Sequence, residues 1–359
     1  MKNFLIVLFV LILVSLGGYF GWRYYNQSQA TDSPTIKART TKDGFIWGVT
    51  TRPHALARYS DKIWQKQVAF ASNLGVGYVR TGWEPEGWYN GKLDPIGLSQ
   101  ALIKEIETQG MRTYLGFGEN GKITDSTNPY QDGYDLANQI ASANKGHVDY
   151  YQLANEISSE SLKGAEFPGD ETSQYDLEKY QKIKDWLNGA IDGVKKADPQ
   201  AKTVVVGQWT QIAFFDMLSE DGVNYDIIGW DWFSDMGLMK DVKISDGTYL
   251  VDKLKSFNKP VILAEVGQRP DGNKTTGFTM NEDKQDQFIS EMANWAHGSG
   301  FIKGFFAFEL TDLTNYGKGG YIDRYGLVAF KRNKQGVGVM TGLRKAYSSY
   351  AAIVTKYSN

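Results

Sequence analysis

The sequence alternates short, apolar, β-like runs with longer helical patterns from residue 43 to the C-terminus, and it does so eight times. The strand-like runs are residues 45–50, 77–83, 112–118, 148–156, 202–208, 225–232, 260–267 and 302–310. The helical patterns that follow them are residues 62–75, 98–110, 134–146, 177–197, 212–220, 247–257, 284–300 and 342–358. Continuous apolar runs are typical of parallel strands that are buried on both faces of a sheet.

Eight strand–helix units in a chain of this length predict an α/β protein with a single TIM (β/α)8 barrel over residues 43–359. An open, doubly wound sheet is the alternative arrangement of such units. Nucleotide-binding sheets of that class carry a glycine-rich turn after a strand. No such turn follows the predicted strands, which favours the closed barrel.

A hydrophobic segment precedes the predicted barrel. Residues 4–22 are apolar except for Ser15 and Tyr19, and a run of this length can span a bilayer as a helix. A cleaved signal peptide needs small residues soon after the apolar core, and none are evident. We therefore expect residues 1–23 to be an uncleaved signal anchor, with a removed signal peptide as the alternative, and residues 24–42 to be a polar linker.

Either interpretation of this segment places the barrel outside the cytoplasm. With an anchor, the protein is held at the membrane through its N-terminal segment. With a cleaved signal peptide, it is secreted. In both cases the oligomeric state stays open.

The composition excludes several classes of function. A net charge of −2 gives no support for nucleic acid as a partner. The chain has no cysteine, which rules out disulfides and thiol catalysis. The three histidines, His54, His147 and His297, are not spaced as metal ligands usually are. We therefore expect neither a metal nor an organic cofactor.

Two acidic residues end apolar strands. Glu156, preceded by Asn155, ends the fourth predicted strand, and Glu265 ends the apolar part of the seventh. A buried carboxylate without partners costs several kcal/mol, so these positions need a reason. In such barrels the active site lies at the carboxyl ends of the strands. Two facing carboxyl groups are what the cleavage of a glycosidic bond requires, with Glu156 as acid/base and Glu265 as nucleophile.

This pattern resembles clan A, the large group of retaining (β/α)8 glycoside hydrolases that includes cellulases, mannanases, galactanases and β-xylosidases. The resemblance covers the chain from about residue 43. It implies a double displacement on a β-linked oligo- or polysaccharide. It also implies that Asn155 hydrogen-bonds the 2-hydroxyl of the sugar and that Arg80, in YVRTGW, supports the nucleophile.

The chain departs from the clan pattern at two strands. Asp231 stands where His or Asn is common, and Trp232 stands where the clan has the tyrosine that hydrogen-bonds the nucleophile. Strand eight, FFAFELTD, lacks the usual tryptophan platform and offers Phe306 and Phe308 instead. The identity of the sugar and of the linkage therefore stays open, as does the choice between internal and terminal cleavage.

Several further side chains near strand ends are candidate sugar contacts. Aromatic rings stack on the faces of pyranoses, and amides and acids bond their hydroxyls. The candidates, besides Asn155 and Arg80, are Trp83, Gln208, Trp209, Asp231, Trp232 and His54. For His54 a role in loop structure is an equal alternative. Glu119, after strand three, is expected to be solvated.

Other functions are compatible with the same pattern. The two glutamates could be structural acids that cap helices or pair with Arg80. The protein would then be a non-catalytic, membrane-tethered barrel that binds carbohydrate. A transglycosylase would use the catalytic residues of a hydrolase and differ only in the acceptor that replaces water. The fold alone does not separate these functions.

Overall fold

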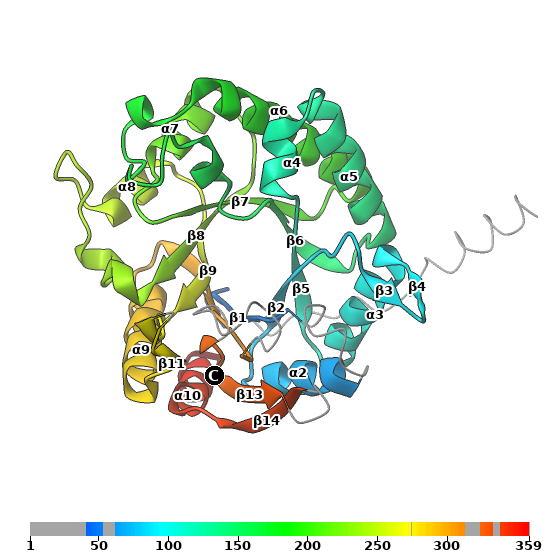
Figure 1. The fold of residues 1–359 in the computed structure, drawn as a ribbon, viewed down its shortest axis with the longest axis vertical. Coiled ribbons are helices and arrows are strands. Elements are labelled where there is room, and N and C mark those ends of the chain that lie inside the picture. The colour runs from blue at the N-terminus through cyan, green and yellow to red at the C-terminus, as the bar shows by residue number, and fades with distance from the viewer. Residues whose placement is uncertain (1–40, 53–61, 274, 313–323, 333–337, 359) are drawn as a thin grey trace, which may run out of the picture. The chain divides into compact units, whose positions relative to one another are not determined.

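The computed structural model describes residues 41–52, 62–273, 275–312, 324–332 and 338–358 (Figure 1). Its centre is a closed barrel of parallel strands in the order β1-β12-β9-β8-β7-β6-β5-β2. The barrel strands are β1 (Ile46–Thr50), β2 (Tyr78–Gly82), β5 (Arg112–Phe117), β6 (Val148–Leu153), β7 (Lys202–Gln208), β8 (Ile227–Phe233), β9 (Val261–Gly267) and β12 (Ile302–Ala307). The predicted single (β/α)8 barrel is confirmed.

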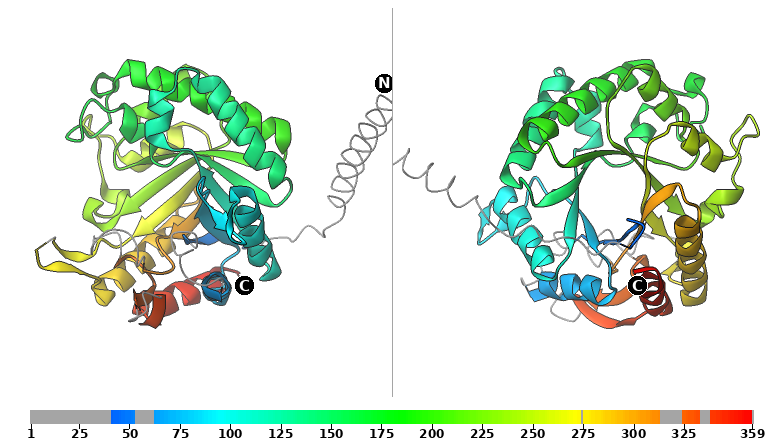
Figure 2. Two further views of the ribbon diagram at one scale, coloured as in Figure 1. Left: turned by 45° about the vertical axis from the view of Figure 1, so that its right-hand side comes forward. Right: turned by 180° about the vertical axis from the view of Figure 1, so that it is seen from behind.

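A ring of helices surrounds the strands, as the view from behind in Figure 2 also shows. These helices are α2 (Lys62–Asn73), α3 (Pro95–Thr108), α5 (Pro129–Ala143), α6 (Leu177–Ala197), α7 (Ala213–Glu220), α8 (Leu250–Ser256), α9 (Glu282–Gly298) and α10 (Lys345–Ser358). Each predicted helical pattern has formed a helix. Strands and helices bury one large apolar core between them, and a smaller cluster fills the barrel interior.

Two helices begin earlier than the sequence-based bounds, and the residues at their starts explain the difference. Helix α3 begins at Pro95, three residues before the predicted start, because Asp94 accepts a hydrogen bond from the Gly97 amide and proline suits the first helical position. Helix α5 begins at Pro129 for the same reason of proline geometry. Hydrophobic periodicity does not register these first turns.

The loops that follow the barrel strands contain short elements that the sequence did not predict. They are β3 (Trp88–Tyr89), β4 (Lys92–Leu93), α4 (Asn120–Asp125), η2 (Ile157–Ser161), η3 (Thr172–Gln174), η4 (Ser234–Met236), η5 (Met239–Asp241), β10 (Asp271–Asn273), β11 (Gly277–Thr279), β13 (Val328–Arg332) and β14 (Gly338–Leu343). Because they follow strands, they surround the mouth at which the predicted site lies.

The predicted anchor, residues 4–22, and His54 lie outside the described residues. Within the part of the chain that the structure describes, no helix combines the length and the apolar character that a membrane span needs. The anchor therefore stays a prediction.

Close packing inside the barrel makes Gly48 intolerant of a side chain. A Cβ at Gly48 would lie 2.2 Å from the ring of Phe306, which is fully buried and packs edge-on against Tyr114. We expect Gly48→Ala to lower the free energy of unfolding by about 1–3 kcal/mol through overpacking, measured by urea denaturation. The matched control is Gly121→Ala in α4, where a Cβ meets nothing within 4 Å and the change should raise stability by about 0.5–1 kcal/mol. Equal effects of the two substitutions would contradict this packing account.

Candidate active site

An ion pair between Arg80 and Glu265 forms the centre of the site. Arg80 on β2 donates from Nη1 to Oε1 of Glu265 on β9 at 2.5 Å, and both side chains are buried. The guanidinium also donates from Nε to Gln152 and from Nη2 to Oδ1 of Asn155, each at 2.9 Å. All three nitrogens of Arg80 are therefore engaged, and only one of them bonds a carboxylate.

Glu156 follows β6 in a strained turn. Ala154 and Glu156 both have left-handed backbone conformations, with φ values of 63° and 47°, which cost free energy for residues other than glycine. Strand β6 has ended at Leu153, so this turn carries Glu156 away from the strand direction. Glu156 and Glu265 line one cavity of about 420 Å³.

The two glutamates have different electrostatic surroundings. Burial, and after it the negative charge of Glu265, raise the pKa of Glu156 to about 7, although Arg80 and Arg269 oppose the shift. Glu265 has a guanidinium in direct contact, whereas Glu156 forms no ion pair with the basic side chains of the described residues. One carboxyl group that keeps its proton near neutral pH and one that pairs with a cation form the arrangement that acid and nucleophile require.

A third carboxyl group lies beside this pair. Asp231 on β8 is the register partner of Glu265 on the neighbouring strand and is fully buried. One oxygen each from Glu156, Asp231 and Glu265 lie within 4.8 Å of one another. Burial and the charge of Glu265 raise the pKa of Asp231 well above its usual range. Arg80 already supplies positive charge to this cluster, which disfavours a metal cation there.

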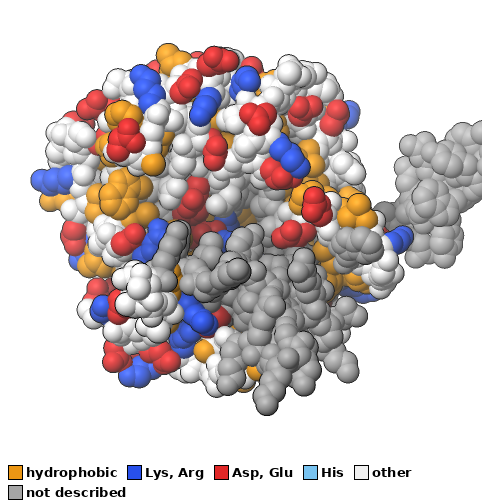
Figure 3. Space-filling model, in the orientation of Figure 1, with side chains coloured by type: hydrophobic (Ala, Val, Ile, Leu, Met, Phe, Trp, Pro, Cys, Tyr) orange, Lys and Arg blue, Asp and Glu red, His pale blue; other side chains and the backbone are white. Residues whose placement is uncertain are grey.

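Three cavities adjoin one another at the mouth of the barrel. A cavity of about 240 Å³ is lined by Trp83, Asn155 and Glu265 among others. It shares Asn155 and Glu265 with the cavity of about 420 Å³. That cavity in turn shares Gln208 and Arg269 with a third, of about 800 Å³. Figure 3 shows the hollow in this face, with acidic side chains inside it.

The structure brings most of the predicted sugar contacts to this mouth. Trp83 lines the first cavity. Trp209 lines the third and is 40% exposed. Gln208 lines two cavities and donates its amide to the Ser159 hydroxyl at 2.8 Å. Glu119 is exposed and pairs with Lys122, so the prediction that it is solvated is confirmed.

Two predicted contacts need correction. Trp232 is fully buried, and its indole nitrogen donates to the Gly237 carbonyl at 2.8 Å, so its ring is not available to stack on a sugar. Asp231 is also fully buried and lies beside Glu156 and Glu265. Its neighbours are therefore these two acids and not the sugar. The two residues are neighbours on one strand, where successive side chains point to opposite faces.

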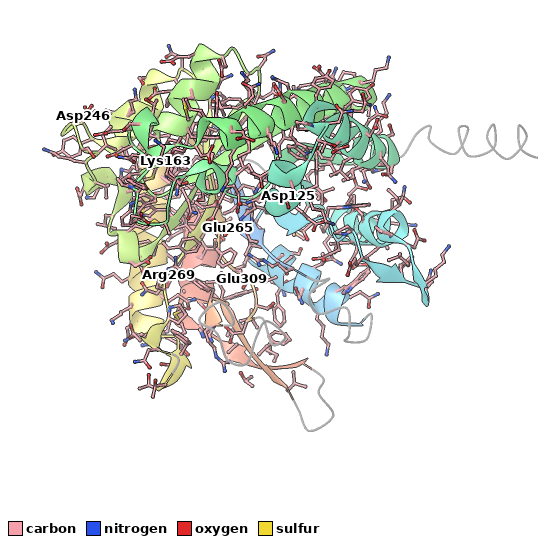
Figure 4. All side chains as sticks on the ribbon, turned by 45° about the horizontal axis from the view of Figure 1, so that its top comes forward. Asp125, Lys163, Asp246, Glu265, Arg269 and Glu309 are labelled. Atoms are coloured by element: carbon pink, nitrogen blue, oxygen red, sulfur yellow. The ribbon has the colours of Figure 1, made fainter. Side chains whose placement is uncertain are left out.

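Three residues of the site were not predicted. Gln152 orients Asn155 by donating its amide to Oδ1 at 2.9 Å. Arg52 follows β1 and lines two of the cavities, with its guanidinium 5.1 Å from the centre of the Phe308 ring. Arg269 follows β9 and pairs with Asp235. Figure 4 shows Arg269 together with Glu265 and Glu309. A basic residue two positions after a predicted strand was the available signal for Arg52 and Arg269.

The comparisons with known proteins agree with this geometry. A model of glycosyl hydrolase family 53 matches residues 124–300, just under half of the chain. The family 1 β-glucosidase from Thermotoga maritima has a TM-score of 0.63 at 12% identity, over 89% of this chain and 99% of that chain. A β-glucosidase from Thermotoga maritima in complex with glucoimidazole has a TM-score of 0.61 at 13% identity, over 89% and 100%. No curated protein matches the sequence.

At these identities the solved structures show a shared fold, and the family match adds sequence evidence over the middle of the barrel. Family 53 is a clan A family. The resemblance to the clan A retaining glycoside hydrolases, predicted from the residues at the strand ends, is thereby confirmed. The family match over residues 124–300 supports a glycoside hydrolase, and the solved structures support the barrel fold.

The electrostatic coupling of the two glutamates predicts the titration of Glu156. Replacing Glu265 by Gln removes the negative charge that helps to raise the pKa of Glu156 and leaves Arg80 unpaired. We expect the pKa of Glu156 to fall from about 7 by about one pH unit or more, measured by NMR of protein with ¹³C-labelled glutamate carboxyl groups. In the control variant Glu119→Gln the pKa of Glu156 should not change. An unchanged value in Glu265→Gln would show that the two groups are not coupled.

Proposed function

We propose that the protein is a retaining glycoside hydrolase that cleaves β-linked oligo- or polysaccharides, with Glu265 as nucleophile and Glu156 as acid/base. The observation that carries this proposal is the approach of the two glutamates within 4.8 Å, with Arg80 on Glu265. Retaining enzymes hold their carboxyl groups about 5–5.5 Å apart, whereas inverting enzymes need about 6.5–9.5 Å to admit a water molecule. The limit of 4.8 Å is for one oxygen of each group, a spacing that fits the closely placed carboxyl groups of a retaining enzyme.

In the first step the carboxylate of Glu265 attacks the anomeric carbon, and the bond from that carbon to the leaving oxygen breaks. Glu156 gives its proton to the leaving oxygen. In the second step Glu156, now a carboxylate, takes a proton from a water molecule that attacks the anomeric carbon and displaces Glu265. A sugar hydroxyl in place of water would give transglycosylation by the same residues.

Asn155 is oriented for a contact with the substrate. Its Oδ1 accepts hydrogen bonds from both Arg80 and Gln152, which fixes the amide orientation and leaves the Nδ2 hydrogens as donors. We propose that they bond the 2-hydroxyl of the sugar in the reacting position, a contact that strengthens in the transition state. Trp83 and Trp209 would stack on sugar rings on either side, with Gln208 as a further polar contact.

The two acids should be indispensable for turnover. We expect Glu156→Ala and Glu265→Ala to lower kcat/KM by about 10³-fold or more on the best substrate of a panel of aryl β-glycosides and β-linked galactan, glucan, mannan and xylan. Azide should restore turnover of at least one variant and give a glycosyl azide, because a small anion can replace a missing carboxylate.

The control for this experiment is Glu119→Gln, at the same mouth but exposed, which should keep full activity. A protein that turns over nothing on the panel, yet binds oligosaccharides tightly with either glutamate replaced, would be the non-catalytic carbohydrate-binding barrel instead.

We also propose that the barrel is held at the outer side of a membrane by residues 4–22, with residues 24–42 as a tether. The apolar length of the segment supports an uncleaved anchor. In cells that express the full chain, the protein should stay in the membrane fraction after washing with alkaline carbonate, and its mass should include residue 1. Release of a shortened chain into the medium would identify a cleaved signal peptide and a secreted protein.

A further inference from the structure

Asp231 is a buried acid for which the double displacement has no use. Its side chain contacts neither solvent nor a cavity, because Asp231 has no accessible surface. Within the described part of the chain, neither of its carboxyl oxygens accepts a hydrogen bond from a backbone, amide, hydroxyl or basic group; its hydrogen-bonding partner is the side chain of Glu156. The polar groups nearest to it are instead two acids, Glu156 and Glu265, within 4.8 Å. A carboxylate in such surroundings would be desolvated and repelled.

The charges around Asp231 come from several barrel strands. Glu265 on β9, Glu156 after β6 and Arg80 on β2 are the charged groups that act on it, and the Tyr114 hydroxyl from β5 is a further titratable neighbour. Arg80 bonds Glu265 through one nitrogen and uses the other two for Gln152 and Asn155. One buried cation thus faces three buried or half-buried carboxyl groups.

This imbalance allows only one of the three carboxyl groups to be ionised without a large desolvation cost. An uncompensated buried charge costs several kcal/mol, and Arg80 compensates one. The ion pair at 2.5 Å assigns that charge to Glu265 in the free protein. A proton on Asp231 removes the second charge and converts its carboxyl group from an acceptor into a donor.

We propose that Asp231 is a positioning residue: a neutral carboxylic acid that keeps its proton and donates a hydrogen bond to the charged member of the Glu156–Glu265 pair. It thereby supplies the hydrogen-bond donor that a tyrosine supplies in the clan pattern. No tyrosine is present in the segment WDWF of β8. The role of Asp231 in turnover rests on the proposed function. The protonation of Asp231 does not depend on that function.

The charge of the cluster stays constant through both steps of the reaction. In the free enzyme Glu265 is ionised, and Glu156 and Asp231 are protonated. After the first step Glu265 is a neutral ester and Glu156 is the carboxylate, because its proton has left with the product. In both states one negative charge faces Arg80. Asp231 shares a side-chain hydrogen bond with Glu156, and one oxygen of Glu265 lies within 4.8 Å of it, so a rotation of the side chains brings the proton of Asp231 within hydrogen-bonding distance of Glu265.

A pair of substitutions separates this role from that of a charged or merely space-filling residue. Asp231→Asn keeps the shape, the neutrality and a donor, so we expect kcat/KM within about fivefold of the wild type. Asp231→Leu keeps the branched shape, although its side chain is larger, and removes the donor, so we expect a loss of about 10²-fold. A loss in Asp231→Asn as large as in Asp231→Leu would mean that the ionised form is needed and would overturn the proposal. So would full activity in Asp231→Leu.

Infrared spectroscopy tests the proton directly and needs no substrate. At about pH 9, two units above the pKa of about 7 of Glu156, the full-length wild type should retain the carbonyl band of a protonated carboxylic acid. The band should be absent from Asp231→Asn. A wild type without this band would overturn the proposal even if Asp231→Leu failed to fold. A wild type with the band but without glycosidase activity would contradict the proposed function and still support the protonation.

A metal in the cluster would give a different result. Treatment with EDTA should leave both the activity and the infrared band unchanged. Loss of activity on EDTA, restored by Ca²⁺, would show that the three carboxyl groups bind a cation in their ionised forms and would overturn the proposal.

Discussion

The ion pair between Arg80 and Glu265 is the interaction on which the rest of the site depends. Arg80 lies on β2 and Glu265 on β9, and in the closed order β1 and β12 separate these two strands. The guanidinium therefore reaches Glu265 through the interior of the barrel mouth, and the contact exists only because the sheet closes. A buried pair of this kind stabilises a protein only when its remaining hydrogen-bonding groups are satisfied, and Gln152 and Asn155 satisfy them.

The same ion pair determines the charges of its neighbours. With one cation in contact with Glu265, the site can hold one negative charge at low cost. Burial, and after it the charge of Glu265, therefore raise the pKa of Glu156 to about 7. That proton is what a general acid needs. Asp231, more deeply buried, is held in the neutral form by the same shortage of positive charge. The chemistry of the site thus follows chiefly from the Arg80 guanidinium and three carboxyl groups, with Arg269 as a further cation that opposes the shift in the pKa of Glu156.

Much of this was predictable from the sequence, because it depends on periodicity. The apolar runs and helical patterns gave the eight units of the barrel, and the rule that active sites lie at the carboxyl ends of barrel strands brought Glu156 and Glu265 together. Periodicity could not predict which way each side chain points in a strand that is apolar on both faces. Asp231 and Trp232 were both predicted to contact the sugar, yet Trp232 faces away and bonds the Gly237 carbonyl. The left-handed turn at Ala154 and Glu156 depends on tertiary contacts that no local pattern encodes. For Arg52 and Arg269 the local signal was a basic residue soon after a strand, and their contacts with Phe308 and Asp235 come from the tertiary structure.

The central claim is that Glu265 forms a covalent bond with the substrate. The most direct measurement is to incubate the protein with an activated 2-deoxy-2-fluoro-β-glycoside of its preferred sugar, which slows the second step, and to locate the added mass by peptide mass spectrometry. The account predicts one sugar per chain, attached to Glu265, with Glu156 and Asp231 unmodified. Labelling of either of those residues, or rapid turnover with no adduct and an inverted product, would contradict it.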